Sequence, residues 1–294
     1  MRVPAHLVVR RSLVGVGVAT VAMGFEHRLG AWLVPRTVAG IVTGWILVFA
    51  SAWSLERLAP LGRPVWSATL FSGYGVGIAI AGGVCLILVR ADAASQRAWI
   101  GLGMLSLIVT ALVWRVFASD APASSGDTVR RADPHGSPWT ADAARLVLCY
   151  GVFGFGYIIP ATFLPVMARQ AIPDPSVFAW AWPIFGVAAA GATFVAGVIA
   201  PFAEHRRLWS LGHVVLAVGV ALPVFWPGFV AVLVSALLVG STFTVITMAG
   251  FQEGRRVAGE RGRQMIAAMA SAFSVGQIAG PACVGVLTRS RRRC

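Results

Sequence analysis

Long apolar stretches separated by short polar connectors occupy almost the whole chain. A bilayer core is about 30 Å thick, and an α-helix needs about 20 apolar residues to cross it. Nine stretches reach that length, at 9–27, 31–55, 64–89, 97–118, 143–168, 177–201, 207–225, 227–251 and 264–288. Transmembrane barrel strands would be about half as long and would alternate in polarity. The pattern therefore predicts an all-α polytopic membrane protein.

One polar interval, 119–142, divides these stretches into a group of four and a group of five. It is rich in Ser, Pro, Gly and Asp and has no hydrophobic period, which is typical of a loop. We therefore expect a first domain at 1–118 with four spans, a central cytoplasmic loop at 119–142, and a second domain at 143–294 with five spans.

The two groups of spans carry matching residues at nearly constant distances. Gly62-Arg63 recurs as Gly262-Arg263, Gly40 and Ile46 as Gly240 and Ile246, Val76-Gly77 as Val275-Gly276, and Arg10-Arg11 as Arg206-Arg207. This order pairs spans one to three with spans seven to nine, which indicates a repeat of six spans. Each basic connector keeps its side in both copies. The repeats are therefore parallel, as are the two halves of major facilitator transporters.

Several segments resemble the YbfB/YjiJ-type family of the major facilitator superfamily. They are YGVFGFGYIIPATFLP at 150–165, WAWP at 180–183 with FG at 185–186, LVGSTF at 238–243 with ITMAG at 246–250, GQIAGP at 276–281, and VFASAW at 48–53. The resemblance covers nearly the whole chain. It implies a major facilitator fold and secondary active transport of a small solute by alternating access.

The chain departs from that family at both ends. The family's first two helices and its last helix have no counterpart, so the resemblance implies a partial fold with about nine of twelve helices. Residues 290–294 do not look like family sequence. We therefore expect a chain truncated at both ends.

The positions of the charged residues along the chain indicate both the class of partner and the topology. All 24 basic residues are Arg, and the net charge of +13 would also suit a nucleic-acid-binding protein. The mean hydropathy of +0.79 and the position of the arginines in connectors argue against a nucleic-acid partner. Fifteen arginines lie on the membrane side of the N-terminal connector, and eight lie on the opposite side. The remaining one, Arg36, lies inside a span. By the positive-inside rule the larger set faces the cytoplasm, and we expect a multi-pass protein of the bacterial inner membrane.

Motifs for nucleotide binding, metal binding and hydrolytic catalysis are missing from the sequence. It contains no Walker phosphate loop, HExxH metal motif or Ser-His-Asp arrangement, and its cysteine spacing matches no metal site. We therefore expect neither catalytic residues nor a metal or other cofactor. The segment GYGVG at 73–77 superficially looks like a dinucleotide fingerprint. Inside an apolar span it instead favours close packing of helices.

Arg36 is the most distinctive candidate for function. It lies inside the second span, where a charge normally faces a cavity or a partner because its desolvation is costly. The spacing Arg36-x-x-x-Gly40-x-x-x-Gly44 resembles the fourth-helix motif of proton-coupled facilitators, with Ala39 in place of the usual Gln. The resemblance implies a role in proton coupling. Alternatively, the side chain only extends to the nearby interface.

The other candidates for the solute pathway or for coupling are uncharged or titrate near neutral pH. They are Tyr150, Tyr157, Trp182, His213, Thr247 and Gln277. The imidazole of His213 could carry a proton, or it could form only a hydrogen bond that supports helix packing. Phenols and amides at mid-span need a partner, although Trp and Tyr also anchor helices at the interface.

Three functions remain open at this point. The favoured one is a facilitator that moves a small solute across the lipid bilayer, coupled to protons. A non-transporting remnant is the alternative that truncation suggests. A multi-span membrane enzyme would need clustered carboxylates or histidines at one membrane face, and the sequence does not indicate such a cluster.

The distribution of arginines leads to a prediction about topology. The loop at 119–142 and the connectors at 56–63, 202–207 and 252–263 should all be cytoplasmic, because arginine-rich connectors are retained on that side. A reporter enzyme that is active only in the periplasm should therefore stay inactive when it is fused at Gly126. Activity from that fusion would contradict the predicted orientation.

Overall fold

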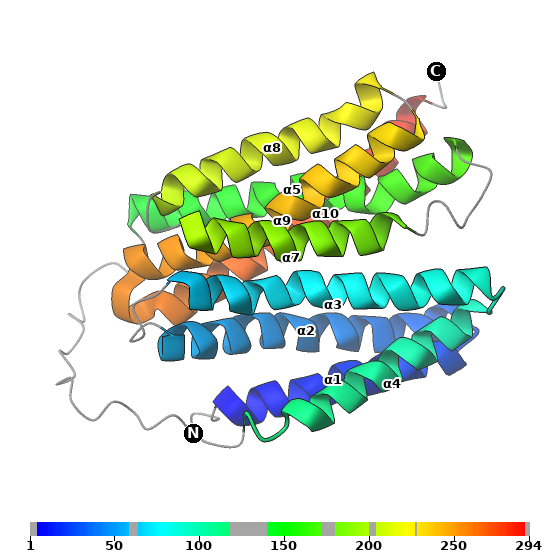
Figure 1. The fold of residues 1–294 in the computed structure, drawn as a ribbon, viewed down its shortest axis with the longest axis horizontal. Coiled ribbons are helices and arrows are strands. Elements are labelled where there is room, and N and C mark those ends of the chain that lie inside the picture. The colour runs from blue at the N-terminus through cyan, green and yellow to red at the C-terminus, as the bar shows by residue number, and fades with distance from the viewer. Residues whose placement is uncertain are drawn as a thin grey trace. The chain divides into compact units, whose positions relative to one another are not determined.

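The computed structural model describes residues 5–58, 64–117, 140–171, 180–199, 204–226 and 228–291, and its regular structure is helical there (Figure 1). Within these ranges, nine helices are long and apolar enough to cross a membrane. They are α1 (Ala5–Phe25), α2 (Leu29–Leu58), α3 (Pro64–Arg90), α4 (Ser95–Val113), α5 (Ala141–Ala171), α7 (Ala181–Ile199), α8 (His205–Phe225), α9 (Phe229–Ala258) and α10 (Gly262–Arg291).

The predicted spans and the all-α fold class are confirmed. The largest differences lie at helix ends, where α9 continues to Ala258 although its apolar stretch was predicted to end at residue 251. Hydropathy marks where the lipid ends and not where the backbone hydrogen bonds end, so polar turns extend the helix. A short 3-10 turn (Gly259–Arg261) then leads into α10.

The helices form two compact units that are not contiguous in sequence. The first comprises Met1–Leu61 and Ala93–Ala144 and contains α1, α2 and α4. The second comprises Gly62–Asp92 and Arg145–Cys294 and contains α3 with α5 and α7 to α10. Helix α3 thus packs with helices from the far side of the central loop. The division of the sequence at 119–142 into two domains stays a prediction.

In the first unit, small residues bring α1 against α4. A Cβ atom built on Gly103 would lie 2.6 Å from the backbone nitrogen of Val21, and one on Gly24 would lie 2.9 Å from the carbonyl oxygen of Gln96. Any larger side chain would therefore push the two backbones apart. Beside this contact, the rings of Trp32 and Trp99 meet edge to face with their centroids 5.8 Å apart.

In the second unit, α3 and α7 touch backbone to backbone. A Cβ atom on Gly75 would lie 2.7 Å from the carbonyl oxygen of Gly186, and one on Gly82 would lie 2.8 Å from Cδ of Pro183. Nothing lies within 4 Å of the corresponding positions on Gly73 and Gly77. The packing interpretation of the segment at 73–77 is thus confirmed for Gly75, the one of the three glycines that faces α7.

Hydroxyl groups of α3, α7 and α9 form hydrogen bonds with backbone carbonyl oxygens of α7. The Thr193 hydroxyl of α7 and the Thr244 hydroxyl of α9 lie 2.7 and 3.0 Å from the carbonyl oxygen of Ala189 and also contact each other. The Ser72 hydroxyl of α3 donates to the carbonyl oxygen of Ala190 at 3.0 Å. These short polar side chains satisfy their own hydrogen-bonding needs on the neighbouring backbone, so they can be buried among apolar residues.

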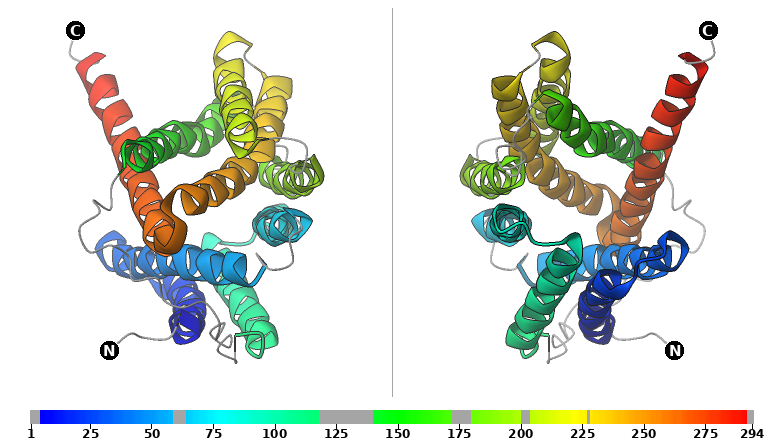
Figure 2. Two further views of the ribbon diagram at one scale, coloured as in Figure 1. Left: turned by 90° about the vertical axis from the view of Figure 1, so that its left-hand side faces the viewer. Right: turned by 90° about the vertical axis from the view of Figure 1, so that its right-hand side faces the viewer.

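Helix α5 lies between α10 on one side and the α8–α9 pair on the other, as both end-on views show (Figure 2). Its contact with α10 again depends on glycine. A Cβ atom on Gly276 would lie 2.7 Å from the backbone nitrogen of Phe155, and one on Gly280 would lie 3.1 Å from the carbonyl oxygen of Phe155. On the α8 side, the Ser235 hydroxyl of α9 donates to the carbonyl oxygen of Gly219 at 2.6 Å.

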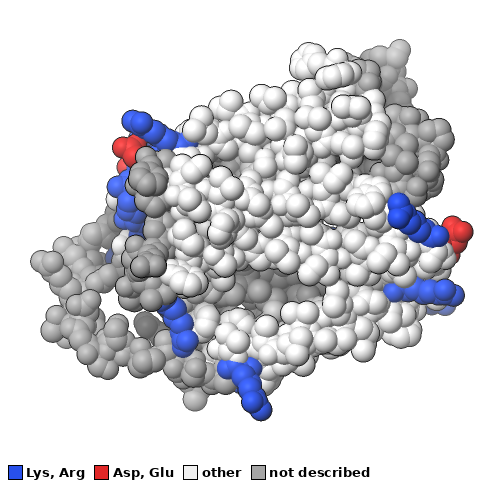
Figure 3. All heavy atoms as spheres, viewed as in Figure 1, with Lys and Arg blue, Asp and Glu red and all other residues white. Residues whose placement is uncertain are grey.

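Charged side chains gather at the ends of the helices on the face shown in Figure 3, and the band between them is uncharged. One carboxylate at such an end is fully buried. Glu253 of α9, whose exposed fraction is 1%, accepts hydrogen bonds from Arg206 at 2.7 Å and from Arg256 at 2.8 Å. Because Arg206 belongs to α8, this ion cluster ties the start of α8 to the end of α9.

The α3–α7 contact yields a prediction about stability. Gly75→Val should lower the apparent melting temperature and the yield of monodisperse protein, because the new side chain would collide with the backbone of α7, which cannot move independently. Gly77→Val is the matched control, since its Cβ enters open space two residues away. Size-exclusion chromatography and thermal unfolding in detergent measure both effects. Equal behaviour of the two variants would contradict the packing argument.

The ion cluster yields a second prediction. Glu253→Gln should lower the free energy of unfolding by about 1–3 kcal/mol, because two guanidinium groups lose their shared anion, which amounts to a fall of several degrees in melting temperature. Glu204→Gln is the control, because the Glu204–Arg207 pair is solvent-exposed and 3.5 Å apart and should contribute little. Equal melting temperatures of the two variants would contradict a stabilising role of the ion cluster.

Candidate transport site

Three aromatic residues lie on one face of α5. Tyr150, Phe153 and Tyr157 are three and four residues apart, which places their side chains on the same side of a helix. All three are buried, and their rings follow one another with centroid distances of 5.5 and 6.0 Å. This face is turned toward the interior of the second unit.

Rings from α9 and α10 complete an aromatic core around that face. Phe243 stacks on Tyr157 with a centroid distance of 4.4 Å and an angle of 22° between the planes. Phe273 lies 5.2 Å from Phe153, and Phe251 lies 5.5 Å from Tyr150. We use the name aromatic core for Tyr150, Phe153, Tyr157, Phe243, Phe251 and Phe273. It is the largest gathering of aromatic rings among the described residues.

Two of the predicted pathway residues meet inside the aromatic core. The phenol of Tyr150 lies within hydrogen-bonding range of the Thr247 hydroxyl, which itself donates to the carbonyl oxygen of Phe243 at 2.9 Å. The pair provides a buried, uncharged polar group that a solute could engage by exchanging one hydrogen bond for another.

His213 lies at the edge of the aromatic core. Its ring contacts Phe153 edge to face at 5.4 Å, and its Nδ1 lies 2.8 Å from the carbonyl oxygen of Trp209 on the same helix. Because a carbonyl only accepts, Nδ1 carries the hydrogen and Nε2 keeps a lone pair. This bond lies within α8 and does not join two helices, so the role of His213 stays a prediction.

Trp209 is a residue that sequence reasoning missed. Its indole Nε1 is buried and has no hydrogen-bond partner within the described ranges. A Cβ atom on Gly250 would lie 3.4 Å from this nitrogen and 3.0 Å from Cε2 of Tyr150, so the small residue lets the two rings approach. A buried donor without a partner is costly, and it could be satisfied by an acceptor on a bound solute.

Two other predicted pathway residues lie outside this group. Trp182, at the start of α7, is partly exposed. Its ring centroid lies 5.7 Å from that of Phe185, and Phe185 lies 6.3 Å from Phe243 of the aromatic core. Gln277 of α10 is half-buried and follows Gly276, the point of contact with α5. The structure thus brings Tyr150, Tyr157, Thr247 and His213 together, whereas Trp182 lies one ring further out and Gln277 lies one helical turn after Phe273.

Arg36 lies in the first unit, on an exposed face of α2. Nothing lies within 4 Å of a Cβ atom built on Gly40 or Gly44, the two glycines of its motif. Ala39, on another face of the helix, is buried in a core with Ala19 and Met23 of α1. The face of α2 that carries Arg36 and the two glycines is therefore turned away from the packing of its own unit.

Sequence reasoning found the polar members of the site better than its aromatic members. Phe153, Phe243 and Phe273 went unnoticed because a Phe inside an apolar span adds only to hydropathy. The spacing of Tyr150, Phe153 and Tyr157 was the one available signal. Within the described ranges, no three His, Cys, Asp or Glu side chains lie together as a metal site would require.

Comparisons with known proteins agree with this architecture. The family model described as "Uncharacterised MFS-type transporter YbfB" matches residues 1–291. Among solved structures, the human organic anion transporter MFSD10 (TETRAN) is similar, with a TM-score of 0.68 and 17% sequence identity over 95% of this chain and 70% of that chain. At this identity the likeness shows the fold alone. No curated protein matches the sequence.

These findings confirm the resemblance drawn from the sequence motifs, and they place the chain in a family of membrane transporters. The fold is that of the major facilitator superfamily, and the protein crosses the membrane several times. The chain belongs to the YbfB-type family of major facilitator transporters.

Proposed function

We propose that this protein moves a small solute across the bacterial inner membrane by alternating access and couples the movement to protons. The observation that carries the proposal is membership of a transporter family in a sequence without a phosphate-binding loop. Without nucleotide hydrolysis, an ion gradient is the available source of energy. The two compact units support alternating access, because rocking requires bodies that are each internally well packed.

The aromatic core and its polar edge suit the solute pathway. Tyr150, Thr247 and His213 offer hydrogen-bond donors and acceptors without a fixed charge, and the faces of Tyr157 and Phe243 offer apolar contact. Trp182, exposed at the start of α7, is a candidate for one end of the pathway, and Gln277, well inside the α10 span, is a candidate for its wall. A solute with a flat apolar part and a few polar atoms would complement this combination.

Arg36 and His213 are the candidates for proton coupling. The guanidinium group stays charged at physiological pH, so Arg36 would act on a proton carrier through its field rather than by losing a proton. The open face of α2 beside Gly40 and Gly44 leaves room for a partner to approach. His213 has a second ring nitrogen whose lone pair can accept a proton or a hydrogen bond.

Transport can be tested with the purified chain in liposomes that contain the pH-sensitive dye pyranine. Small carboxylates, amino acids, amines and neutral aromatic compounds are added one at a time, after a thermal-shift screen has ranked them. We expect at least one solute to change the internal pH and to accumulate when a proton gradient is imposed. If no compound moves faster than through empty liposomes, transport by this chain is ruled out for those classes.

Variants then separate coupling from binding. Arg36→Ala should abolish proton-driven accumulation while membrane expression stays unchanged, because the coupling charge is lost. Arg28→Ala, which removes an exposed arginine next to the start of α2, should transport like the parent. Unchanged accumulation in Arg36→Ala would show that this side chain only extends to the membrane interface.

Tyr150→Phe should weaken solute binding, since it removes the phenol beside Thr247 and keeps the ring.

A further inference from the structure

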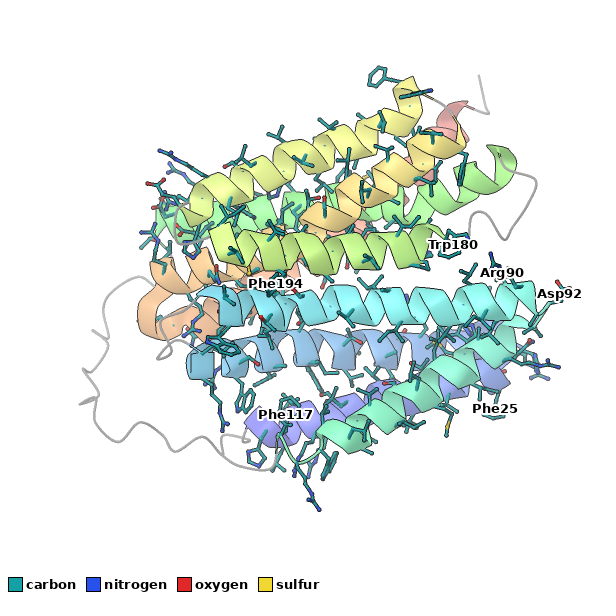
Figure 4. All side chains as sticks on the ribbon, viewed as in Figure 1. Phe25, Arg90, Asp92, Phe117, Trp180 and Phe194 are labelled. Carbon is teal, nitrogen blue, oxygen red and sulfur yellow. The ribbon has the colours of Figure 1, made fainter. Side chains whose placement is uncertain are left out.

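Arginine and aromatic side chains gather at one end of the first unit, outside the candidate transport site. Arg10 comes from the second turn of α1, Trp53 and Arg57 come from the last turns of α2, and Trp114 to Phe117 form the turns that follow α4. Figure 4 labels Phe117 at this end of the unit and Phe25 at the opposite end. We use the name arginine–tryptophan cluster for Arg10, Arg57, Arg115, Trp53, Trp114 and Phe117.

Direct contacts fix the geometry of this cluster. Nε and Nη2 of Arg10 donate to the carbonyl oxygen of Trp114 at 3.2 and 2.6 Å, and the guanidinium carbon lies 4.6 Å from the centroid of the Trp114 ring. The Arg57 guanidinium lies 4.3 Å from the Trp53 ring, and that ring lies 5.2 Å from Phe117. Arg10 of α1 therefore contacts the turn after α4 directly, and Trp53 of α2 contacts it through Phe117.

Three arginines at this end of the unit have no carboxylate partner among the described residues. Arg115 is exposed in the turn between Trp114 and Phe117, and Arg11 is exposed beside Arg10. Among the described residues, no carboxylate pairs with Arg10, Arg11 or Arg115. Arg10 uses two of its five N–H groups on a carbonyl oxygen, so it keeps further donors. Fixed guanidinium groups with spare donors suit a phosphate group.

The surroundings distinguish a lipid phosphate from a dissolved one. The apolar helices begin and end at the cluster, which places it at the level of the lipid head groups, where Trp and Arg are typical residues. Exposed aliphatic side chains continue from it along α4 and α1, with Leu112 exposed to 76% and Val18 to 55%. A dissolved anion would use only the charges, whereas a phospholipid would use the charges and cover the aliphatic side chains with its acyl chains.

We propose that the arginine–tryptophan cluster binds the head group of an anionic phospholipid. Arg10 and Arg115 hold the phosphate, and Trp53, Trp114 and Phe117 lie at the level of the glycerol backbone. The lipid would connect α1, α2 and α4 at the end where Arg10 and Trp53 already meet the turn after α4. The proposal is independent of the transport function, because its measurement needs no solute.

Native mass spectrometry of the full chain in detergent tests the proposal. The protein is titrated with phosphatidylglycerol and, separately, with phosphatidylcholine of the same acyl chains. We expect phosphatidylglycerol to bind more tightly and Arg115→Ala to weaken it by about fivefold, the contribution of one basic residue beside an anionic head group. The Arg115 side chain is exposed and makes no hydrogen bond, ion pair or ring contact within the described part of the unit, so this variant should leave the packing intact. Arg10→Ala added to it should weaken binding further.

Arg28→Ala and Arg97→Ala are matched controls at the opposite end of the unit. Both arginines are exposed, and neither lies over an aromatic ring within the described ranges. Their loss should leave phosphatidylglycerol binding unchanged. Equal weakening by the control variants, or equal binding of the two lipids, would overturn the proposal. Glycerol phosphate, which lacks acyl chains, is added as a competitor, and displacement of the lipid at equal concentration would indicate a site for dissolved phosphate instead.

Discussion

Direct contact between helix backbones holds each unit together. In a bilayer the hydrophobic effect does not drive one apolar helix against another, because lipid tails are as apolar as the side chains. Association then depends on close van der Waals contact and on hydrogen bonds between helices. Three glycines supply the close contact, because the backbone of a neighbouring helix occupies the space of the missing side chain. The pairs are Gly75 with Gly186, Gly103 with Val21, and Gly276 with Phe155.

The same constraint explains how polar groups are buried. Thr193, Thr244 and Ser72 place their hydroxyls on carbonyl oxygens of α7, so burial leaves no donor without an acceptor. The buried carboxylate of Glu253 needs charged partners and not only neutral ones. Arg206 and Arg256 provide them. Trp209 departs from the rule, since its indole nitrogen is buried without a partner among the described residues. This departure marks a position where a solute could bind.

The two kinds of arginine environment correspond to two roles. Arg206 and Arg256 neutralise an internal carboxylate, and their effect is structural. Arg10 and Arg115 face no described carboxylate and lie beside aromatic rings and exposed aliphatic side chains, which favours an external anion. Arg36 belongs to neither group, because it lies along the length of a helix, on an exposed face that it shares with Gly40 and Gly44.

Hydropathy alone determined the number, order and approximate limits of the helices, because a residue in lipid must be apolar whatever its neighbours are. Motif resemblance added the family. The sequence could not decide which glycines make contact: Gly75 packs against α7 while Gly73 and Gly77 do not, and Gly240 packs against Phe185 while its repeat counterpart Gly40 meets nothing. It also could not show that α3 joins the helices beyond the central loop, or that Tyr150 meets Thr247. These features depend on how each helix is rotated about its axis and which neighbour it meets, and in a uniformly apolar helix only tertiary packing fixes both.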